Sequence, residues 1–180
     1  MADRKTQIIA AATTLFLEEG VGVSTAKIAK AANISNGTLF NVFATKQLLI
    51  DAIFRDAKEG MFNSVPHFGD APFNRTHLRA NWDGYLAWAE QNPRTRRVMH
   101  LLLDAGLASA ETQAEVNAIA APHGAWLQDA LNRGTIRGPS VSFIGRLIFF
   151  QLDLVINEKL DAAGEELAFD MLCTAIGLTQ

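Results

Sequence analysis

The fold is decided by the stretch from Ser24 to Asn41, which is STAKIAKAANISNGTLFN. Its first half predicts a short helix over residues 25–32, because apolar residues recur there at the three- and four-residue spacing of one helix face. These residues are Ile28, Ala29 and Ala32, with Lys27 and Lys30 left facing water. Asn33 follows where a tight bend is needed, and asparagine is the non-glycine residue that best tolerates a left-handed backbone. Ile34 is expected to lie under that bend as an apolar plug.

The second half of the stretch predicts another short helix, over residues 36–41. Ser35 is a good N-cap for it, and Leu39 is expected to point inward. The side chains expected to point outward are Asn36, Thr38 and Asn41. Two short helices joined by a tight bend are typical of a helix-turn-helix that contacts DNA through its second helix.

The segments on either side extend this unit. A first helix is expected from about Lys5 to Glu19, with Gly20 ending it. Its apolar stripe consists of Ile8, Ala12, Leu15 and Phe16. Thr45 is expected to cap a helix from Lys46 to about Ser64. The apolar face of that helix consists of Leu48, Leu49, Ala52, Ile53 and Phe54.

The remaining sequence is also helical in pattern, so the fold class is all-α. Residues 65–72 contain two prolines and a glycine and predict a mobile surface loop. Further helices are expected over residues 74–91, 93–107, 110–133, 140–160 and 165–178, with Gly164 marking an end. Pro122 should kink or split the third of these helices.

Composition indicates a soluble protein with a sizeable core. The 180 residues are 49% hydrophobic, and the formal net charge of −3 argues against a protein that coats nucleic acid without specificity. A single cysteine, Cys173, cannot form an intrachain disulfide, which favours the reducing cytoplasm, and a small buried residue is its simplest role. We expect no secretion signal, because the sequence opens MADRK and continues directly into a helical pattern without an apolar signal core. We expect no membrane partner, because residues 141–160 are interrupted by charged and polar side chains.

The N-terminal residues resemble the TetR family of ligand-responsive transcriptional regulators. The family's Leu-Phe-x-x-x-Gly helix end appears as Leu15, Phe16 and Gly20, and its Ile-Ala pair as Ile28 and Ala29. The closing signature appears here as residues 34–49, ISNGTLFNVFATKQLL. The sequence departs from the family pattern where Asn33 replaces a glycine, Phe40 a tyrosine, and Val42 an aromatic residue or histidine. Phe40 lacks the hydroxyl that the family's tyrosine commonly offers to a phosphate, which predicts slightly weaker binding.

The resemblance implies a three-helix DNA-binding domain over residues 1–50 and a helical effector-binding and dimerisation domain over residues 51–180. The implied function is a sequence-specific transcriptional regulator, a repressor released from a palindromic operator in double-stranded DNA by a small-molecule effector. The alternative is a helical interaction module that has lost DNA binding. No enzyme, metal or other cofactor is expected, because the sequence contains no motif with catalytic or metal-ligand spacing.

Nine residues are the candidates for DNA contact. They are Thr25, Lys27, Ser35, Asn36, Gly37, Thr38, Phe40, Asn41 and Lys46. Thr25 and Lys46 are expected to contact phosphates, with a plain N-cap and a solvated lysine as their respective alternatives. Lys27 is either a second phosphate contact or an exposed lysine. Asn36, Thr38 and Asn41 are the candidates for base contacts, and Gly37 would let the backbone approach the duplex.

Two further surfaces are expected in the C-terminal part. A homodimer interface is predicted at Phe143, Leu147, Phe150, Leu154, Phe169, Cys173 and Ile176, with a helix pair buried in a monomer as the alternative. An effector pocket is predicted at Met61, Phe62, Trp82, Tyr85, Met99, His100, Leu103, His123 and Trp126, with ordinary core packing as the alternative. His123 continues an apolar stripe and needs either a core partner or a ligand.

Overall fold

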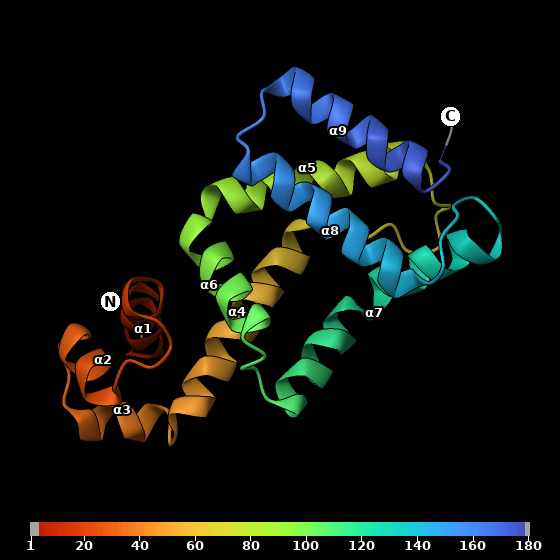
Figure 1. Cartoon of the computed structure of the whole chain (residues 1–180). Coiled ribbons are helices and arrows are strands. Elements are labelled where there is room, and N and C mark those ends of the chain that lie inside the picture. The colour runs from red at the N-terminus through yellow and green to blue at the C-terminus, as the bar shows by residue number, and fades with distance from the viewer. Residues whose placement is uncertain (1–3, 179–180) are drawn as a thin grey trace. The chain divides into compact units, whose positions relative to one another are not determined.

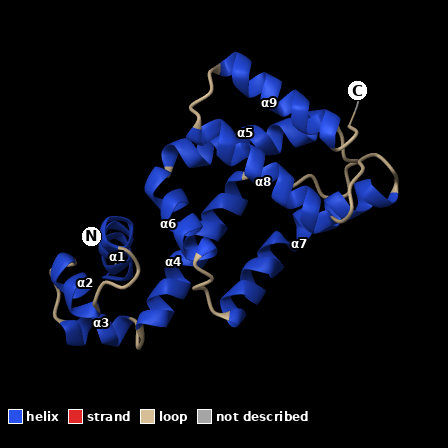
Figure 2. Ribbon diagram, in the orientation of Figure 1, coloured by secondary structure: helices blue, strands red, loops and turns tan. Residues whose placement is uncertain are grey.

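A computed structural model describes residues 4–178, and nine helices account for the secondary structure of this range (Figures 1 and 2). No strand occurs among the described residues, so the all-α prediction is confirmed. The described chain forms two compact units. Unit 1 contains residues 4–60 and 91–118, and unit 2 contains residues 61–90 and 119–178. The predicted functional division after residue 50 stays a prediction.

Unit 1 begins with the three predicted N-terminal helices. They are α1 (Arg4–Glu19), α2 (Thr25–Ala31) and α3 (Asn36–Val42). The buried residues of α1 are the four of the predicted stripe, and Gly20 ends this helix with a left-handed φ of +83°. Both α2 and α3 pack against α1. Gln7 on α1 donates to the Ala32 carbonyl at 2.8 Å, which attaches the end of α2 to α1.

Three longer helices complete unit 1, two of which continue into unit 2. They are α4 (Lys46–Ser64), α6 (Pro93–Asp104) and α7 (Ala110–Asn132). α6 packs against α1, and α4 is joined to α7 by the buried carboxylate of Asp51, which accepts from the Ser109 amide at 2.8 Å. Thr45 caps α4 as predicted, accepting from the Leu48 amide. Leu48 itself is 51% exposed, so its placement on the buried face of α4 was wrong; the other four predicted residues are buried.

Unit 2 contains the remaining helices, α5 (Arg75–Gln91), α8 (Val141–Asn157) and α9 (Ala162–Ala175), with the end of α4 and most of α7. α9 is held to α5 around Phe169, which is 1% exposed. The guanidinium groups of Arg75 and Arg79 lie 5.0 and 5.1 Å from the centre of this ring, and Trp82 contacts it edge-on at 5.4 Å. Arg79 also pairs with Glu165 at 2.8 Å. The hydrogen bond with Asp170 of α9 raises the pKa of Arg75. Burial opposes the charge of Arg79, but Asp83 on α5 and then Glu166 and Glu165 on α9 raise its pKa overall.

Several helix boundaries differ from the sequence prediction. α6 ends at Asp104 and α9 at Ala175, each three residues before the predicted end. α9 begins three residues earlier than expected, because Asp161 is its N-cap and accepts from the Gly164 amide at 2.8 Å. Gly164 therefore lies in the first turn of a helix instead of ending one. α8 stops at Asn157, and Lys159 has a left-handed φ of +52°.

Pro122 does not split α7, which continues through it from Ala110 to Asn132. The predicted loop is present between α4 and α5, and two of its rings, Phe68 and Phe73, pack on Trp126 of α7. The indole of Trp126 donates to the Ala71 carbonyl in this loop at 2.9 Å. None of the helices in residues 4–178 is both long and apolar enough to cross a bilayer.

Candidate nucleic-acid interface and ligand pocket

The N-terminus of α2 is capped by Ser24. Its hydroxyl accepts from the Lys27 amide at 3.3 Å, and its backbone is extended. The alternative that Thr25 is the N-cap was therefore wrong, since Thr25 is the first residue of the helix. The half-buried Thr25 side chain is left out of the cap, which keeps its hydroxyl available for a phosphate.

The bend between α2 and α3 has the predicted backbone. Asn33 adopts a left-handed φ of +52°, and the Ile34 amide donates to the Ala29 carbonyl at 3.0 Å. This bond satisfies one of the carbonyls left free at the end of α2. The bend fixes where α3 begins and so which of its side chains point outward.

The outward side of α3 is polar. Ser35 caps the helix by accepting from the Thr38 amide at 3.0 Å, and its hydroxyl lies 2.8 Å from the Thr38 hydroxyl. Leu39 is fully buried on the opposite side. We call Asn36, Thr38 and Asn41 the reading face; both asparagines are exposed and Thr38 is half-buried. Their amide and hydroxyl groups can pair with base edges in a major groove.

Gly37 lies within the reading face, and the protein's own packing does not require it. A Cβ atom built at Gly37 would lie 3.8 Å from the Ser35 hydroxyl oxygen, an ordinary van der Waals distance. Glycine in a helix costs about 0.5–1 kcal/mol relative to alanine. The reason for this glycine is thus to be sought outside the protomer, where an approaching surface would gain from a missing side chain.

Two of the predicted basic contacts have partners within unit 1. Lys27 pairs with Glu19 at 2.6 Å, and both side chains are exposed. The Lys46 ammonium donates to the Val21 carbonyl at 2.5 Å and lies 5.9 Å from the centre of the Phe16 ring. An ammonium has three donors, so the bond to Val21 positions Lys46 and leaves two donors for a phosphate. Phe40 on α3 is 40% exposed.

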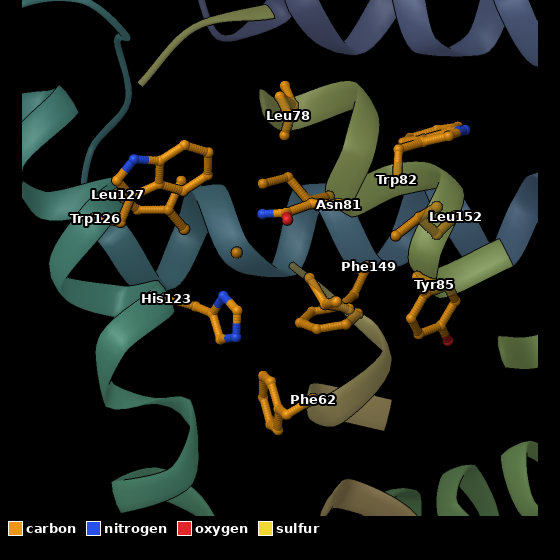
Figure 3. Close-up of a pocket in the computed structure, with 13 residues that line it drawn as sticks. Phe62, Leu78, Asn81, Trp82, Tyr85, His123, Trp126, Leu127, Phe149 and Leu152 are labelled. Atoms are coloured by element: carbon orange, nitrogen blue, oxygen red, sulfur yellow. The ribbon is translucent and has the colours of Figure 1, made fainter. Parts of the chain in front are cut away.

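A second candidate site lies within unit 2, where α4, α5, α7 and α8 surround a cavity of about 90 Å³ (Figure 3). Five of the predicted pocket residues line it: Phe62, Trp82, Tyr85, His123 and Trp126. The sequence prediction missed Val65, Leu78, Asn81, Leu127, Gly145, Ile148, Phe149 and Leu152. Their role in binding a ligand stays a prediction.

The other four predicted pocket residues do not line this cavity. Met99, His100 and Leu103 lie on α6 in unit 1, where Met99 is buried and Leu103 is exposed. Met61 is buried on α4, one position before Phe62. Helical spacing alone could not separate residues of one unit from those of the other.

Two polar side chains face the cavity. The side-chain oxygen of Asn81 is buried and accepts no hydrogen bond from the described residues. The His123 ring stacks on Phe62 with centroids 5.5 Å apart and meets the His67 ring edge-on at 5.8 Å. Burial and the nearby His67 lower the pKa of His123, so its imidazole is neutral near pH 7. Asn81 was detectable in the sequence, since it interrupts the helical stripe of Leu78, Trp82 and Tyr85.

The predicted dimer surface separates into exposed and buried residues. On α8, Phe143, Phe150 and Leu154 are exposed and Leu147 is partly exposed. On α9, by contrast, Phe169, Cys173 and Ile176 are buried inside the protomer, so their placement at an intermolecular surface was wrong. The burial of Cys173 also raises the pKa of its thiol. The exposed apolar residues of α9 are Leu167 and Met171.

Comparison with known proteins supports this description of α1 to α4. Residues 8–53 match the family described as "Bacterial regulatory proteins, tetR family", and this range includes α2, the bend and α3. The chain carries the N-terminal domain of the tetR family. The predicted resemblance to this family is confirmed, and the tetR-family domain is a DNA-binding helix-turn-helix.

Solved structures extend the likeness of fold to the whole chain. A TetR family transcription regulator from Marinobacter aquaeolei VT8 is 20% identical, with a TM-score of 0.81 over 96% of this chain and 95% of that one. A putative tetR family transcription regulator from Shewanella sp. PV-4 is 20% identical, with a TM-score of 0.79 over 97% and 98% of the two chains. A tetR family regulatory protein from Rhodococcus RHA1 is 18% identical, with a TM-score of 0.77 over the full length of both. The chain therefore has the fold of these tetR family proteins.

Proposed function

We propose that this chain is a dimeric transcriptional repressor that binds a palindromic operator through α3 and leaves it when a small molecule occupies the unit 2 pocket. The observation that carries the proposal is the polar, exposed reading face of a tetR-family domain, with Gly37 in its middle. The capped start and the left-handed bend at Asn33 hold this short helix in one orientation.

The proposed contacts divide by chemistry. Thr25, Lys27 and Lys46 bind phosphates and supply affinity that falls with salt. Asn36, Thr38 and Asn41 contact base edges and supply sequence preference, since an amide can pair with adenine and a threonine methyl can meet the thymine methyl. Lys27 must exchange Glu19 for a phosphate, so its contribution is smaller than that of Lys46.

A second copy of the chain is the proposed partner of α8 and α9. Phe143, Leu147, Phe150 and Leu154 follow the three- and four-residue spacing of one face of α8. Leu167 and Met171 form the matching face of α9, which packs against α8. A contiguous apolar surface of this kind marks an interaction site in a water-soluble protein. A twofold dimer places two reading helices about 34–36 Å apart, which is one turn of DNA.

Release requires that the effector binds one arrangement of the dimer better than the other. Coupling energies between sites are about 1–3 kcal/mol, so a saturating effector weakens operator binding by roughly 5- to 150-fold. An effector with equal affinity for both arrangements would leave operator binding unchanged.

The test is selection of duplexes from a random DNA library by the full chain. We expect an enriched inverted repeat whose half-sites are centred about one helical turn apart. Asn41→Ala should change the enriched sequence, whereas Lys46→Gln should weaken all duplexes alike and lower the salt slope by about one. Lys159→Gln is the matched control, because Lys159 lies in unit 2 and should leave both properties unchanged. If the chain retains none of the duplexes at low salt, the alternative of an interaction module that has lost DNA binding is favoured instead.

A further inference from the structure

The unit 2 pocket restricts the charge of any molecule that enters it. Of the described residues that line it, none is an acid, a lysine or an arginine, and His123 is the one imidazole. A buried charge without a counter-ion is strongly disfavoured. An ionised carboxylate, phosphate or amine therefore finds no partner among the lining side chains.

The rings that surround the cavity determine its shape preference. Phe62, Trp82, Tyr85, Trp126 and Phe149 contribute aromatic surface from all four lining helices (Figure 3). Flat ligands pack well against such surfaces by stacked or edge-on contacts. The cavity of about 90 Å³ is smaller than the roughly 150 Å³ cavity that holds benzene in an engineered protein core. One ring is thus the upper limit, and its entry must move the lining helices apart slightly.

The Asn81 oxygen adds a requirement for a hydrogen-bond donor. It is buried at the pocket wall and accepts no bond from the described residues, while the Asn81 side chain lies between Leu78 and Trp82 on α5. A buried acceptor without a partner costs stability that a ligand donor would restore. Figure 3 shows the Asn81 amide and the His123 ring pointing into the same space from opposite helices.

We infer that the pocket binds an uncharged single-ring aromatic molecule with one O–H or N–H donor, such as a phenol, and that the donor bonds to the Asn81 oxygen. This inference deepens the proposed function and rests on it for the role of the molecule as an effector. The ring lies against Phe62 and Phe149, where no charged group would need to be buried. Its entry moves the lining helices apart, so it favours an expanded arrangement of unit 2 over the arrangement with a cavity of about 90 Å³.

The experiment compares phenol with toluene, which have the same number of heavy atoms and differ in the donor. Dissociation constants are measured with the full chain by calorimetry and by its tryptophan fluorescence, to which Trp82 and Trp126 of the pocket lining contribute. Asn81→Leu should lower the preference for phenol relative to toluene by about tenfold. This variant should fold, because it replaces a buried acceptor that lacks a partner with an apolar side chain of similar size.

A second pair of variants tests the location without depending on Asn81. Gly145 lines the pocket, and a Cβ built there meets no atom within 4 Å, so Gly145→Leu should fill the cavity and abolish binding of both rings. Gly124→Leu is the control, since Gly124 is also helical with open space around its Cβ but does not line the pocket. Both variants replace a helical glycine with a better helix former.

Three results would overturn the inference. They are an unchanged phenol-to-toluene ratio in Asn81→Leu, binding of benzoate as tight as that of phenol, and the absence of saturable binding by phenol at millimolar concentration. If phenol binds as described and operator affinity does not change, the ligand class stands and the effector role in the proposed function is wrong. If phenol fails but another compound releases operator DNA, the proposed function stands and the ligand class is wrong.

Discussion

Replacing Gly37 by alanine should raise protein stability and weaken DNA binding at the same time. The added methyl group meets Ser35 at an ordinary 3.8 Å, so no strain opposes the gain in helix propensity. Glycine to alanine in a helix is worth about 0.5–1 kcal/mol, and Gly37, as the second residue of α3, falls at the lower end. About 0.5 kcal/mol corresponds to a rise in Tm of roughly 1–2 °C for a chain of this size.

On DNA, the same methyl group lies in the middle of the reading face and holds the helix away from the base edges. Loss of one good base contact costs about 1–3 kcal/mol, so affinity for the selected duplex should fall at least about fivefold. Urea unfolding measures the stability change, and fluorescence anisotropy with a labelled duplex measures affinity. Gly124→Ala, in α7, is the control that should gain stability without losing affinity. Equal affinity of Gly37→Ala and the parent chain would refute the close approach of α3, and a loss of stability would refute the account of its packing.

Three other predictions concern the caps, the pocket and the core. Ser24→Ala removes the N-cap of α2 and should lower the free energy of unfolding in urea by about 1 kcal/mol. Thr25→Ala should leave this free energy unchanged and should weaken binding to all duplexes alike, measured by fluorescence anisotropy. Because the native pKa of His123 is lowered, the unfolded chain binds its proton more readily than the folded chain does. The contribution of neutral His123 to the free energy of unfolding should therefore be fully present above about pH 6.5 and should decline as the pH falls through the native pKa. His123→Phe should reduce this decline, measured by urea unfolding at a series of pH values. Phe150→Ser replaces an exposed ring and should convert the dimer into a folded monomer, as analytical ultracentrifugation will show. Phe169→Ala replaces a buried ring and should instead lower the free energy of unfolding by about 3–5 kcal/mol. A Phe150→Ser variant that remains dimeric would contradict the assignment of α8 to the dimer interface.

The N-terminal helices could be predicted from the sequence because their signals are local. Caps such as Ser35 and Thr45, the asparagine at the bend, and the stripe of α1 each depend on neighbouring residues. The prediction of Thr25 as a possible N-cap, where the structure has Ser24, was also made from local sequence alone. Both residues are good caps, and the backbone conformation that separates them is visible in the structure and not in the pattern.

The C-terminal surfaces were harder to predict because their signals depend on long-range packing. The stripe of Phe169, Cys173 and Ile176 is apolar whether it faces a second copy or the protomer's own core. The burial of Phe169 follows from its contacts with Trp82 and the two arginines of α5, which the spacing of α9 does not show. In the same way, Met99 could be excluded from the pocket only once the division into two units was known.

Hydroxyl-radical footprinting of the full chain on its selected duplex tests the central claim most directly. If two copies each place α3 in the major groove of one operator, two protected patches should appear on one side of the DNA, centred about 10–10.5 base pairs apart. Gly37→Ala should weaken both patches together. A single protected patch, or protection that does not depend on the selected sequence, would contradict the account.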